Sequence, residues 1–170
     1  MPTLRPDTMS RRGLLTTAVA AAALPRPARA RDRPLLTVVS PNGSRQRYDE
    51  EDLAALTWHD IVTHTVWTDG LQTFRGPYLR DILVLTGVTA DDLALRRLTL
   101  TALNDFRVDV PARDAFAFDP ILARNANGQP MLVRDKGPLW LIYPRDTTPA
   151  LQTPEFDERW VWQLTLIEIT

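Results

Sequence analysis

An α+β domain that is mainly β is the fold class that the sequence predicts, and three observations lead to it. Short runs of β-branched and other apolar residues recur along the chain, and several of them alternate apolar with polar residues. Turn-forming residues separate these runs. Two or three short segments show helix-capping residues or helical spacing instead. A chain of 170 residues accommodates one compact domain of this kind and a short leader.

Composition and charge exclude several classes of function. Apolar residues make up 44% and charged residues 24% of the chain, as in ordinary globular proteins. Residues 1–30 hold five of the 20 basic and one of the 21 acidic residues, so 15 basic and 20 acidic residues remain after them. This net charge of −5 disfavours a nucleic-acid-binding surface. The absence of cysteine excludes disulfides, thiolate metal ligands and cysteine nucleophiles.

Residues 1–30 are predicted to be a signal peptide. Arginines precede the uncharged run 13–24, and small residues lead up to a cleavage site near Ala30. As a helix this run would span about 18 Å, too little for a hydrocarbon core of about 30 Å, so we expect no transmembrane anchor after cleavage. Residues 10–15 (SRRGLL) resemble the twin-arginine export consensus. We therefore expect residues 31–170 to be a periplasmic domain.

The first third of this domain should contain strands and one short helix. Residues 35–39 (LLTVV) predict a strand that ends at the turn 41–43 (PNG). Asp49 is placed to cap a helix whose first turn is acidic. Residues 61–67 (IVTHTVW) are rich in β-branched residues and predict a second strand, and residues 72–75 a further extended piece.

The middle of the domain predicts a helix and a hairpin. A helix is expected to begin at Pro77 and to end before Gly87, with apolar residues at helical spacing between them. Residues 97–103 and 106–110 both alternate with a period of two, and Asn104-Asp105 between them favours a turn.

The last third predicts buried strands separated by a long loop. Residues 121–123 lead to Asn127-Gly128, a strong turn signal. Residues 139–143 (LWLIY) predict a central buried strand, and residues 160–169 a final one. Three prolines between them indicate a surface loop over residues 144–158.

Polar clusters interrupt these apolar strands and could form an anion site. They are residues 104–107 (NDFR), residues 134–138 (RDKGP) before the buried strand, and Arg145-Asp146 after it. Arginine presents a rigid fork of donors suited to phosphate, and Lys136 adds a mobile charge, so a phosphate-bearing ligand fits. The alternative is a set of solvated turns with local ion pairs of little energetic value.

The tryptophans and histidines give weaker indications. Trp140, within the predicted buried strand, should be structural, whereas Trp67, just before a Thr-Asp-Gly turn, is best placed to face a ligand. The chain has two histidines, His59 and His64. Along an extended segment their Cβ atoms would lie about 16 Å apart, so we do not expect a shared metal.

Two segments resemble the sulfite-oxidase-type molybdopterin-binding domains. Residues 74–83 (FRGPYLRDIL) are similar to the "W-x-G-V-P-L-x-D-L-L" segment of that family. Residues 122–139, with LA, NGQPM and KGPL, are similar to its "LLAYxMNGxPL…GGPLR" region in content and spacing. The resemblance extends over about residues 57–170 and implies the fold of that family.

The resemblance also implies a molybdopterin cofactor and, with the polar clusters, a set of candidate contacts. These cofactor-binding candidates are Arg75, Asn104, Asp105, Arg107, Arg134, Lys136, Arg145 and Trp67.

One departure from the family concerns the metal. By this resemblance, molybdenum is held by one cysteine thiolate shortly before the predicted helix, and this chain has none. Thr63, His64 and Thr65 occupy that neighbourhood. Hydroxyl and imidazole groups are poorer partners than a thiolate for a high-valent oxo-metal, so the usual molybdenum centre is not expected.

Three functions remain open from the sequence. The first is a periplasmic oxidoreductase-like protein that binds molybdopterin or a related anionic ligand. The second is a non-catalytic periplasmic sensor or binding subunit that keeps the fold without molybdenum and uses the same cleft for a small anion or a membrane-bound redox or signalling partner. The third is a structural or assembly factor without a small ligand. Whether the protein is an enzyme stays open.

Overall fold

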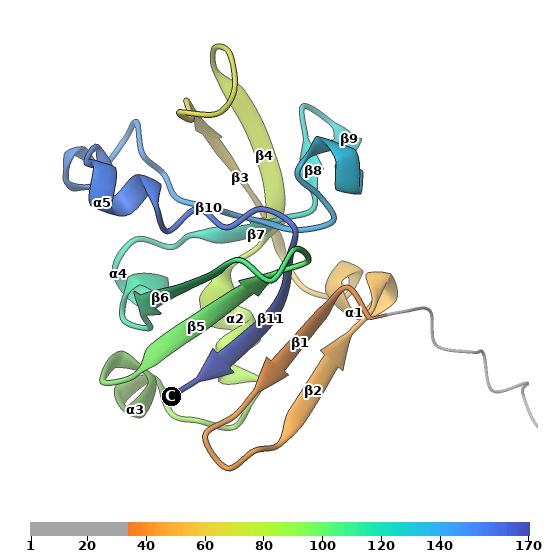
Figure 1. The fold of residues 1–170 in the computed structure, drawn as a ribbon, viewed down its shortest axis with the longest axis vertical. Coiled ribbons are helices and arrows are strands. Elements are labelled where there is room, and N and C mark those ends of the chain that lie inside the picture. Colours follow the sequence, from red (N-terminus) through yellow and green to blue (C-terminus); the bar gives the residue numbers. More distant parts are fainter. Residues whose placement is uncertain (1–33) are drawn as a thin grey trace, which may run out of the picture.

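Three β-sheets and a few short helices make up residues 34–170, the part of the chain that the computed structural model describes (Figure 1). They form a single small domain in which strands predominate, which confirms the α+β, mainly β class. The predicted signal peptide, residues 1–30, and the predicted start of the domain at residue 31 lie outside the described residues.

The largest sheet has five strands. In spatial order they are β2 (Arg45–Tyr48), β1 (Leu36–Val39), β11 (Leu164–Ile169), β5 (Arg97–Ala102) and β6 (Arg107–Pro111). β1 runs parallel to β11, and the other neighbours are antiparallel. The alternating apolar residues of these strands are buried and form one side of the core.

A second sheet lies at the other end of the molecule. Its order is β3 (Trp58–Thr63), β4 (Gln72–Pro77), β8 (Asn125–Ala126) and β9 (Gln129–Pro130). The β8–β9 turn has positive φ at both central residues, 49° at Asn127 and 77° at Gly128, which is the pair of conformations that Asn-Gly adopts most readily.

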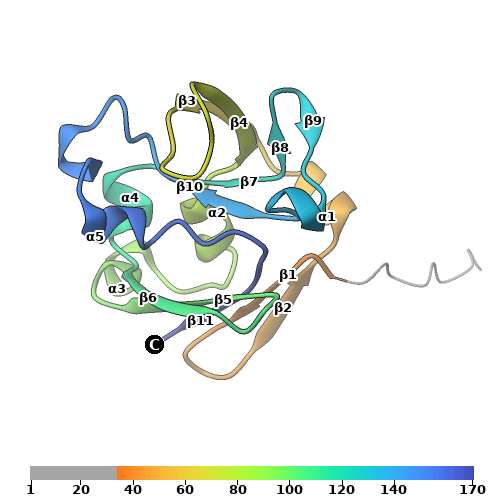
Figure 2. The same ribbon diagram turned by 45° about the horizontal axis from the view of Figure 1, so that its top comes forward.

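A short, fully buried pair of strands, β7 (Ile121–Ala123) and β10 (Trp140–Ile142), lies between the two larger sheets (Figure 2). β4 approaches β7 so closely that a Cβ atom on Gly76 would lie 2.0 Å from the carbonyl oxygen of Leu122. A residue without a side chain is therefore required at this crossing.

The helices are short and cover the sheets. They are α1 (Glu50–Ala54), α2 (Leu79–Val84), α3 (Ala90–Ala94), α4 (Asp114–Ala117) and α5 (Pro154–Asp157), with 3₁₀ turns η1 (Val133–Asp135) and η2 (Pro149–Leu151). Asp49 and Asp52 form a reciprocal capping box at α1, as the sequence predicts for the Asp49 cap. Within residues 34–170, no helix is long and apolar enough to cross a membrane.

The structure corrects several predicted boundaries. The helix predicted from Pro77 begins at Leu79, because the backbone of Tyr78 is still extended. The strand predicted over residues 61–67 begins at Trp58 and ends at Thr63. The final strand begins at Leu164 and not at residue 160, because the residue before it has a φ of 54° that interrupts the extended chain.

Two further differences concern helices. The predicted loop 144–158 contains η2 and α5, both with proline at a first helical position, where its missing N–H costs nothing. The short helix α3, capped by Thr89, was not predicted. The predicted hairpin of residues 97–103 and 106–110 and the buried strand within residues 139–143 are confirmed.

Candidate functional site

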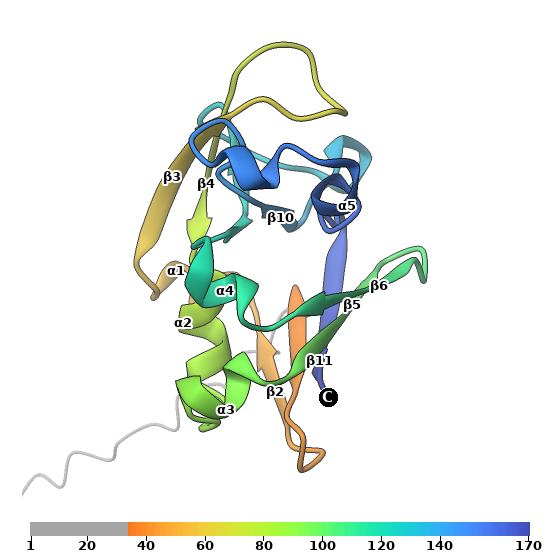
Figure 3. The ribbon, with the colours of Figure 1, turned by 90° about the vertical axis from the view of Figure 1, so that its left-hand side faces the viewer.

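A cleft of about 540 Å³ opens between the tip of the β5–β6 hairpin, α5 and the loop after β3. Figure 3 shows where the hairpin and α5 lie in the fold. Its lining combines aromatic, polar and charged side chains from these separate segments. The lining residues are Trp67, Ala102, Asn104, Phe106, Arg107, Val108, Asp157, Glu158, Trp160, Val161 and Trp162. We call this site the aromatic cleft.

Local hydrogen bonds place Trp67 in the aromatic cleft. The loop after β3 turns at Thr65, whose Oγ1 accepts a hydrogen bond from the backbone N of Trp67 at 3.0 Å. The same oxygen lies 2.8 Å from Oγ1 of Thr68. Because Thr65 is itself buried, this turn holds the indole of Trp67 on the cleft side of the loop.

Trp67 packs edge to face against Trp162 and at a tilt against Trp160. The ring centroids of Trp67 and Trp162 lie 5.3 Å apart at 80°, and those of Trp67 and Trp160 lie 6.0 Å apart. Behind them Trp140 is buried, with its ring 5.2 Å from that of Phe74. Such aromatic pairs favour one fixed arrangement, so the wall of the cleft is preformed.

Both signs of charge lie at the cleft. Arg107 and Asn104 come from the β5–β6 hairpin, and Asp157 and Glu158 come from the opposite side. Nε of Arg145 lies 3.2 Å from Oδ1 of Asp157, so this carboxylate already has a cationic partner. Charge recognition at the cleft therefore depends mainly on Arg107 and Glu158.

Trp160, which lines the cleft, carries a buried hydrogen-bond donor without a partner among the described residues. Its side chain is 2% exposed, and its Nε1 is buried without an acceptor among the described residues. Nε1 of Trp140, behind it, is also without an acceptor among residues 34–170. An unsatisfied buried donor costs about 1–3 kcal/mol, so the two indoles are held in place by packing and not by hydrogen bonds.

Three of the residues that the sequence singles out line the aromatic cleft: Trp67, Asn104 and Arg107. Lys136 lies just behind it, with Nζ 5.6 Å from the ring centroid of Trp140 and 5.7 Å from that of Trp162. The lysine ammonium therefore faces indole rings and not the open cleft.

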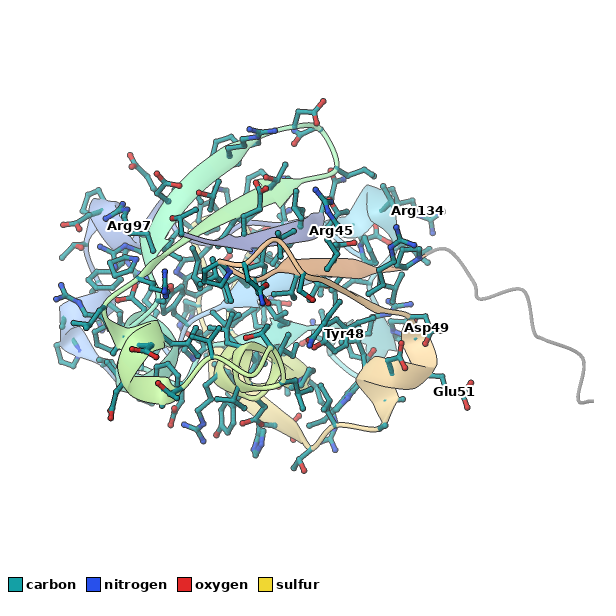
Figure 4. All side chains as sticks on the ribbon, turned by 90° about the horizontal axis from the view of Figure 1, so that it is seen from below. Arg45, Tyr48, Asp49, Glu51, Arg97 and Arg134 are labelled. Carbon is teal, nitrogen blue, oxygen red and sulfur yellow. The ribbon has the colours of Figure 1, made fainter. Side chains whose placement is uncertain are left out.

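The other candidates do not join them. Nη1 of Arg75 lies 2.8 Å from Oδ2 of Asp60 across the β3–β4 ladder, and half of its side chain is exposed. Arg134, 79% exposed, lies at the periphery of the molecule (Figure 4), with Nε 3.5 Å from Oδ2 of Asp135. Arg145 is paired with Asp157, and Asp105 occupies the β5–β6 turn with a φ of 64°.

The neighbourhood of the missing cysteine is closed by internal hydrogen bonds. His64 Nδ1 lies 2.6 Å from Oδ2 of Asp146, and Oγ1 of the buried Thr63 accepts from the backbone N of Asp146 at 3.2 Å. Burial raises the pKa of the Asp146 carboxyl, but the hydrogen bonds and charge of His64 and the Thr63 hydroxyl lower this pKa more, so it lies below its ordinary value.

A second polar cluster, which no pattern in the sequence predicts, lies beside α5. The buried Asp114 accepts hydrogen bonds from Nη1 of Arg159 at 2.5 Å and from the hydroxyl of Tyr143 at 3.4 Å. The sequence prediction also missed four cleft residues. Asp157 and Glu158 fall in the predicted loop 144–158, and Trp160 and Trp162 fall in the predicted final strand. The density of aromatic and charged residues over 156–162 was the available signal.

No protein-family model matches the chain, and no curated protein sequence matches it. Among solved structures, the sulfane dehydrogenase SoxCD from Paracoccus pantotrophus is similar, with a TM-score of 0.58 and 18% sequence identity. The alignment covers 79% of this chain and 37% of the SoxCD chain, so the protein spans little more than a third of that neighbour. The comparison supports a distant relation to this enzyme at the level of the fold.

Proposed function

We propose that the protein is a non-catalytic binding subunit or sensor that takes its ligand in the aromatic cleft. One observation carries the proposal: three indoles from two segments far apart in the sequence, Trp67 in one and Trp160 and Trp162 in the other, line one cleft, and Asn104 and Arg107 lie at the same cleft. Concave, largely apolar sites with a few polar groups are the usual form of ligand sites in proteins.

The described residues do not fit a molybdenum centre. Within residues 34–170, no group of three or more His, Cys, Asp or Glu side chains could hold a metal ion. The hydroxyls of Thr63 and Thr65 and Nδ1 of His64 are used in loop hydrogen bonds. The cationic side chains expected to contact a pterin phosphate are dispersed, with Arg75 and Arg134 paired to neighbouring aspartates.

The aromatic cleft itself defines the chemistry of a ligand. An apolar or flat group fits against the indoles of Trp67, Trp160 and Trp162. An anionic group could pair with Arg107.

The second candidate function is an oxidoreductase that binds molybdopterin. It is supported by the fold likeness to a protein named as a sulfane dehydrogenase, and by Arg107 and Asn104 at the cleft. It requires that the cofactor be held without a cysteine ligand.

Binding of anilinonaphthalene sulfonate (ANS), an aromatic anion, tests the cleft. We expect saturable binding of one equivalent that weakens about tenfold in Trp67→Ala, equivalent to about 1.4 kcal/mol, and also weakens in Arg107→Gln. Arg97→Gln is the control, because Arg97 is exposed at the far end of the same β5–β6 ladder and lies away from Arg134 in Figure 4. An affinity for ANS that is the same in Trp67→Ala, Arg107→Gln and wild type would refute the proposal.

Native mass spectrometry and metal analysis separate the two functions. The protein is purified from the organism that naturally produces it. We expect to find neither bound molybdenum nor an adduct of the mass of a pterin. A stoichiometric pterin adduct or bound molybdenum would favour the oxidoreductase and overturn the non-catalytic proposal.

We also propose that the leader, residues 1–30, directs the protein to the periplasm, where a membrane-bound redox or signalling protein could be its partner. The arginine pair and uncharged run in the sequence support this proposal. N-terminal sequencing of the protein from the periplasmic fraction should start near residue 31. An uncleaved chain confined to the cytoplasm would contradict it.

A further inference from the structure

β6 is a free edge of the five-stranded sheet and borders the aromatic cleft. It is the last strand in the sheet order, and no described strand pairs with its outer side. Arg107 and Val108, at its start, line the cleft, and Asp157 and Glu158 line it from the other side. Figure 3 shows the β5–β6 hairpin projecting below α5. The cleft therefore lies beside an unpaired strand.

Hydrogen bonds at both ends of the β5–β6 ladder fix its pattern. The backbone N of Ala102 donates to the carbonyl oxygen of Phe106 at 2.9 Å. At the other end, the backbone N of Ala112 donates to the carbonyl oxygen of Arg96 at 3.0 Å. Hydrogen-bonded and non-hydrogen-bonded pairs alternate between these ends, as in any regular antiparallel ladder.

This alternation leaves defined backbone groups on the free edge. Val108 and Val110 belong to the pairs that bond to β5, so the N–H and C=O groups of Arg107 and Asp109 point outward. Pro111 occupies the next outward position, where a missing N–H does not weaken the ladder. Arg107 and Asp109 thus present donors and acceptors at the spacing that another strand requires.

The two faces of the β5–β6 ladder determine which side chains of an added strand would point toward the cleft. Ala102 pairs opposite Phe106 and Leu100 opposite Val108, so Phe106 and Val108 project from one face of β6, whereas Arg107 between them projects from the other face and reaches the cleft from the strand edge. Successive side chains of a strand alternate between faces. Every second side chain of a strand added to β6 would therefore enter the cleft beside the tryptophans.

The charge of Glu158 favours a peptide with a basic residue. Glu158 is exposed and makes no ion pair within the described part of the chain, whereas Asp157 is paired with Arg145. A basic side chain of the ligand could meet Glu158.

We propose that the aromatic cleft receives an extended peptide segment of a partner protein, which adds to β6 as a further strand. Alternate apolar side chains of the segment lie among the indoles, and a basic side chain faces Glu158. This inference rests on the proposed function, because it uses the same cleft and names the class of its ligand. Main-chain hydrogen bonds would supply affinity and the pockets for alternate side chains specificity.

A matched pair of substitutions at Asp109 tests the strand addition. Asp109→Pro removes the outward N–H while keeping the ladder, because this position does not donate to β5. Asp109→Ala keeps the N–H. Both substitutions remove the 2.7 Å hydrogen bond from Oγ1 of Thr99 to the Asp109 carboxylate, so that loss cancels in the comparison.

The probe is a phage-displayed library of random dodecapeptides. It is selected on the immobilised protein, which contains all of residues 31–170. We expect enriched peptides that alternate apolar residues, carry a lysine or arginine, and bind Asp109→Pro about tenfold more weakly than Asp109→Ala, the effect of about one net hydrogen bond. Glu158→Gln should weaken the basic peptides by about threefold. Failure to enrich peptides, or equal binding to the two Asp109 variants, would overturn the inference.

ANS binding and oligomeric state distinguish the remaining outcomes. ANS bound normally by Asp109→Pro shows that the cleft is intact, so lost peptide binding is then due to the edge. If wild type binds ANS but no peptide, only the peptide inference fails. If wild type binds neither, the proposed function fails as well. A dimer that Asp109→Pro dissociates would identify a second copy of this chain as the occupant and refute a peptide partner.

Discussion

Asp146 accepts two hydrogen bonds from His64 through a single carboxylate oxygen, Oδ2. The backbone N of His64 lies 3.0 Å from this atom and its Nδ1 lies 2.6 Å from it. The pair joins the loop after β3 to the segment after β10. Since the loop after β3 carries Trp67, Asp146 helps to hold one wall of the aromatic cleft.

We predict that Asp146→Ala lowers the free energy of unfolding at neutral pH by about 1 kcal/mol, the magnitude expected of a partly exposed hydrogen-bonded pair. His64 is more than half exposed, which limits the effect. Urea unfolding measures it. Thr147→Ala is the control, since the Thr147 hydroxyl bonds only locally to the carbonyl oxygen of Pro144 among the described residues. Equal stability of Asp146→Ala and wild type would contradict the prediction.

The contribution of Asp146 to the free energy of unfolding should depend on pH. Because its pKa is lower in the folded protein than in the unfolded chain, the stabilisation is fully present above the unfolded pKa. It is lost as the pH falls through the lower folded pKa. We therefore expect the stability curves of wild type and Asp146→Ala to converge as the pH is lowered below about 4. A difference in the free energy of unfolding between wild type and Asp146→Ala that grows as the pH falls would show that the pKa of Asp146 is raised and not lowered by folding.

A buried ion pair beside α5 gives a larger effect. The side chains of Asp114 and Arg159 are 4% and 12% exposed, so removing one leaves the other charge unpaired in the interior. We predict that Asp114→Ala lowers the free energy of unfolding by about 3–5 kcal/mol. Glu155→Ala removes the exposed partner of Arg159 and should cost about 0.5 kcal/mol or less. Similar losses for both variants would show that burial of the pair is unimportant.

The crossing of β4 over β7 allows no side chain at Gly76. Gly76→Ala places a Cβ atom within 2.0 Å of the Leu122 carbonyl oxygen, and backbone cannot move aside as a flexible side chain can. We predict a loss of at least about 2 kcal/mol, measured by thermal or urea unfolding. Thr73→Ala, an exposed change on the same strand, should alter stability by about 0.5 kcal/mol or less. A Gly76→Ala variant as stable as wild type would contradict this packing.

Local patterns were sufficient to predict much of the fold. The β5–β6 hairpin follows from alternation on both sides of Asn104-Asp105, and the β8–β9 turn follows from Asn127-Gly128. The apolar run at residues 160–162 favours a strand, but Trp160 and Trp162 pack in an aromatic cluster with Trp140, and Trp162 makes only an isolated bridge to Trp140. Tertiary packing of tryptophans, which no local period reports, decided that segment.

The site was less predictable for a related reason. Trp67, Asn104 and Arg107 could be selected by residue type and position near turns. Whether an arginine is available to a ligand depends on its partner in space. Arg75 and Arg145 meet Asp60 and Asp157, which are far from them in the sequence, so no spacing rule separates these two from Arg107.

Substitution of Lys136 tests whether its charge contacts a ligand phosphate or the indole rings beside it. The sequence suggests a phosphate contact, whereas the structure places its Nζ between the rings of Trp140 and Trp162. We predict that Lys136→Met, which keeps an apolar stem, lowers the free energy of unfolding by about 0.5–1 kcal/mol through loss of the cation–π contacts. Arg134→Met, at an exposed site, should change stability by less than this.

The same variants should leave the affinity of the cleft for ANS within about twofold of wild type, because neither side chain lines it. Urea unfolding and fluorescence titration on the same preparations measure the two quantities. A Lys136→Met variant of unchanged stability that binds ANS about tenfold more weakly would contradict the cation–π role and assign Lys136 to the ligand. An equal loss of stability in both variants would indicate a general charge effect instead.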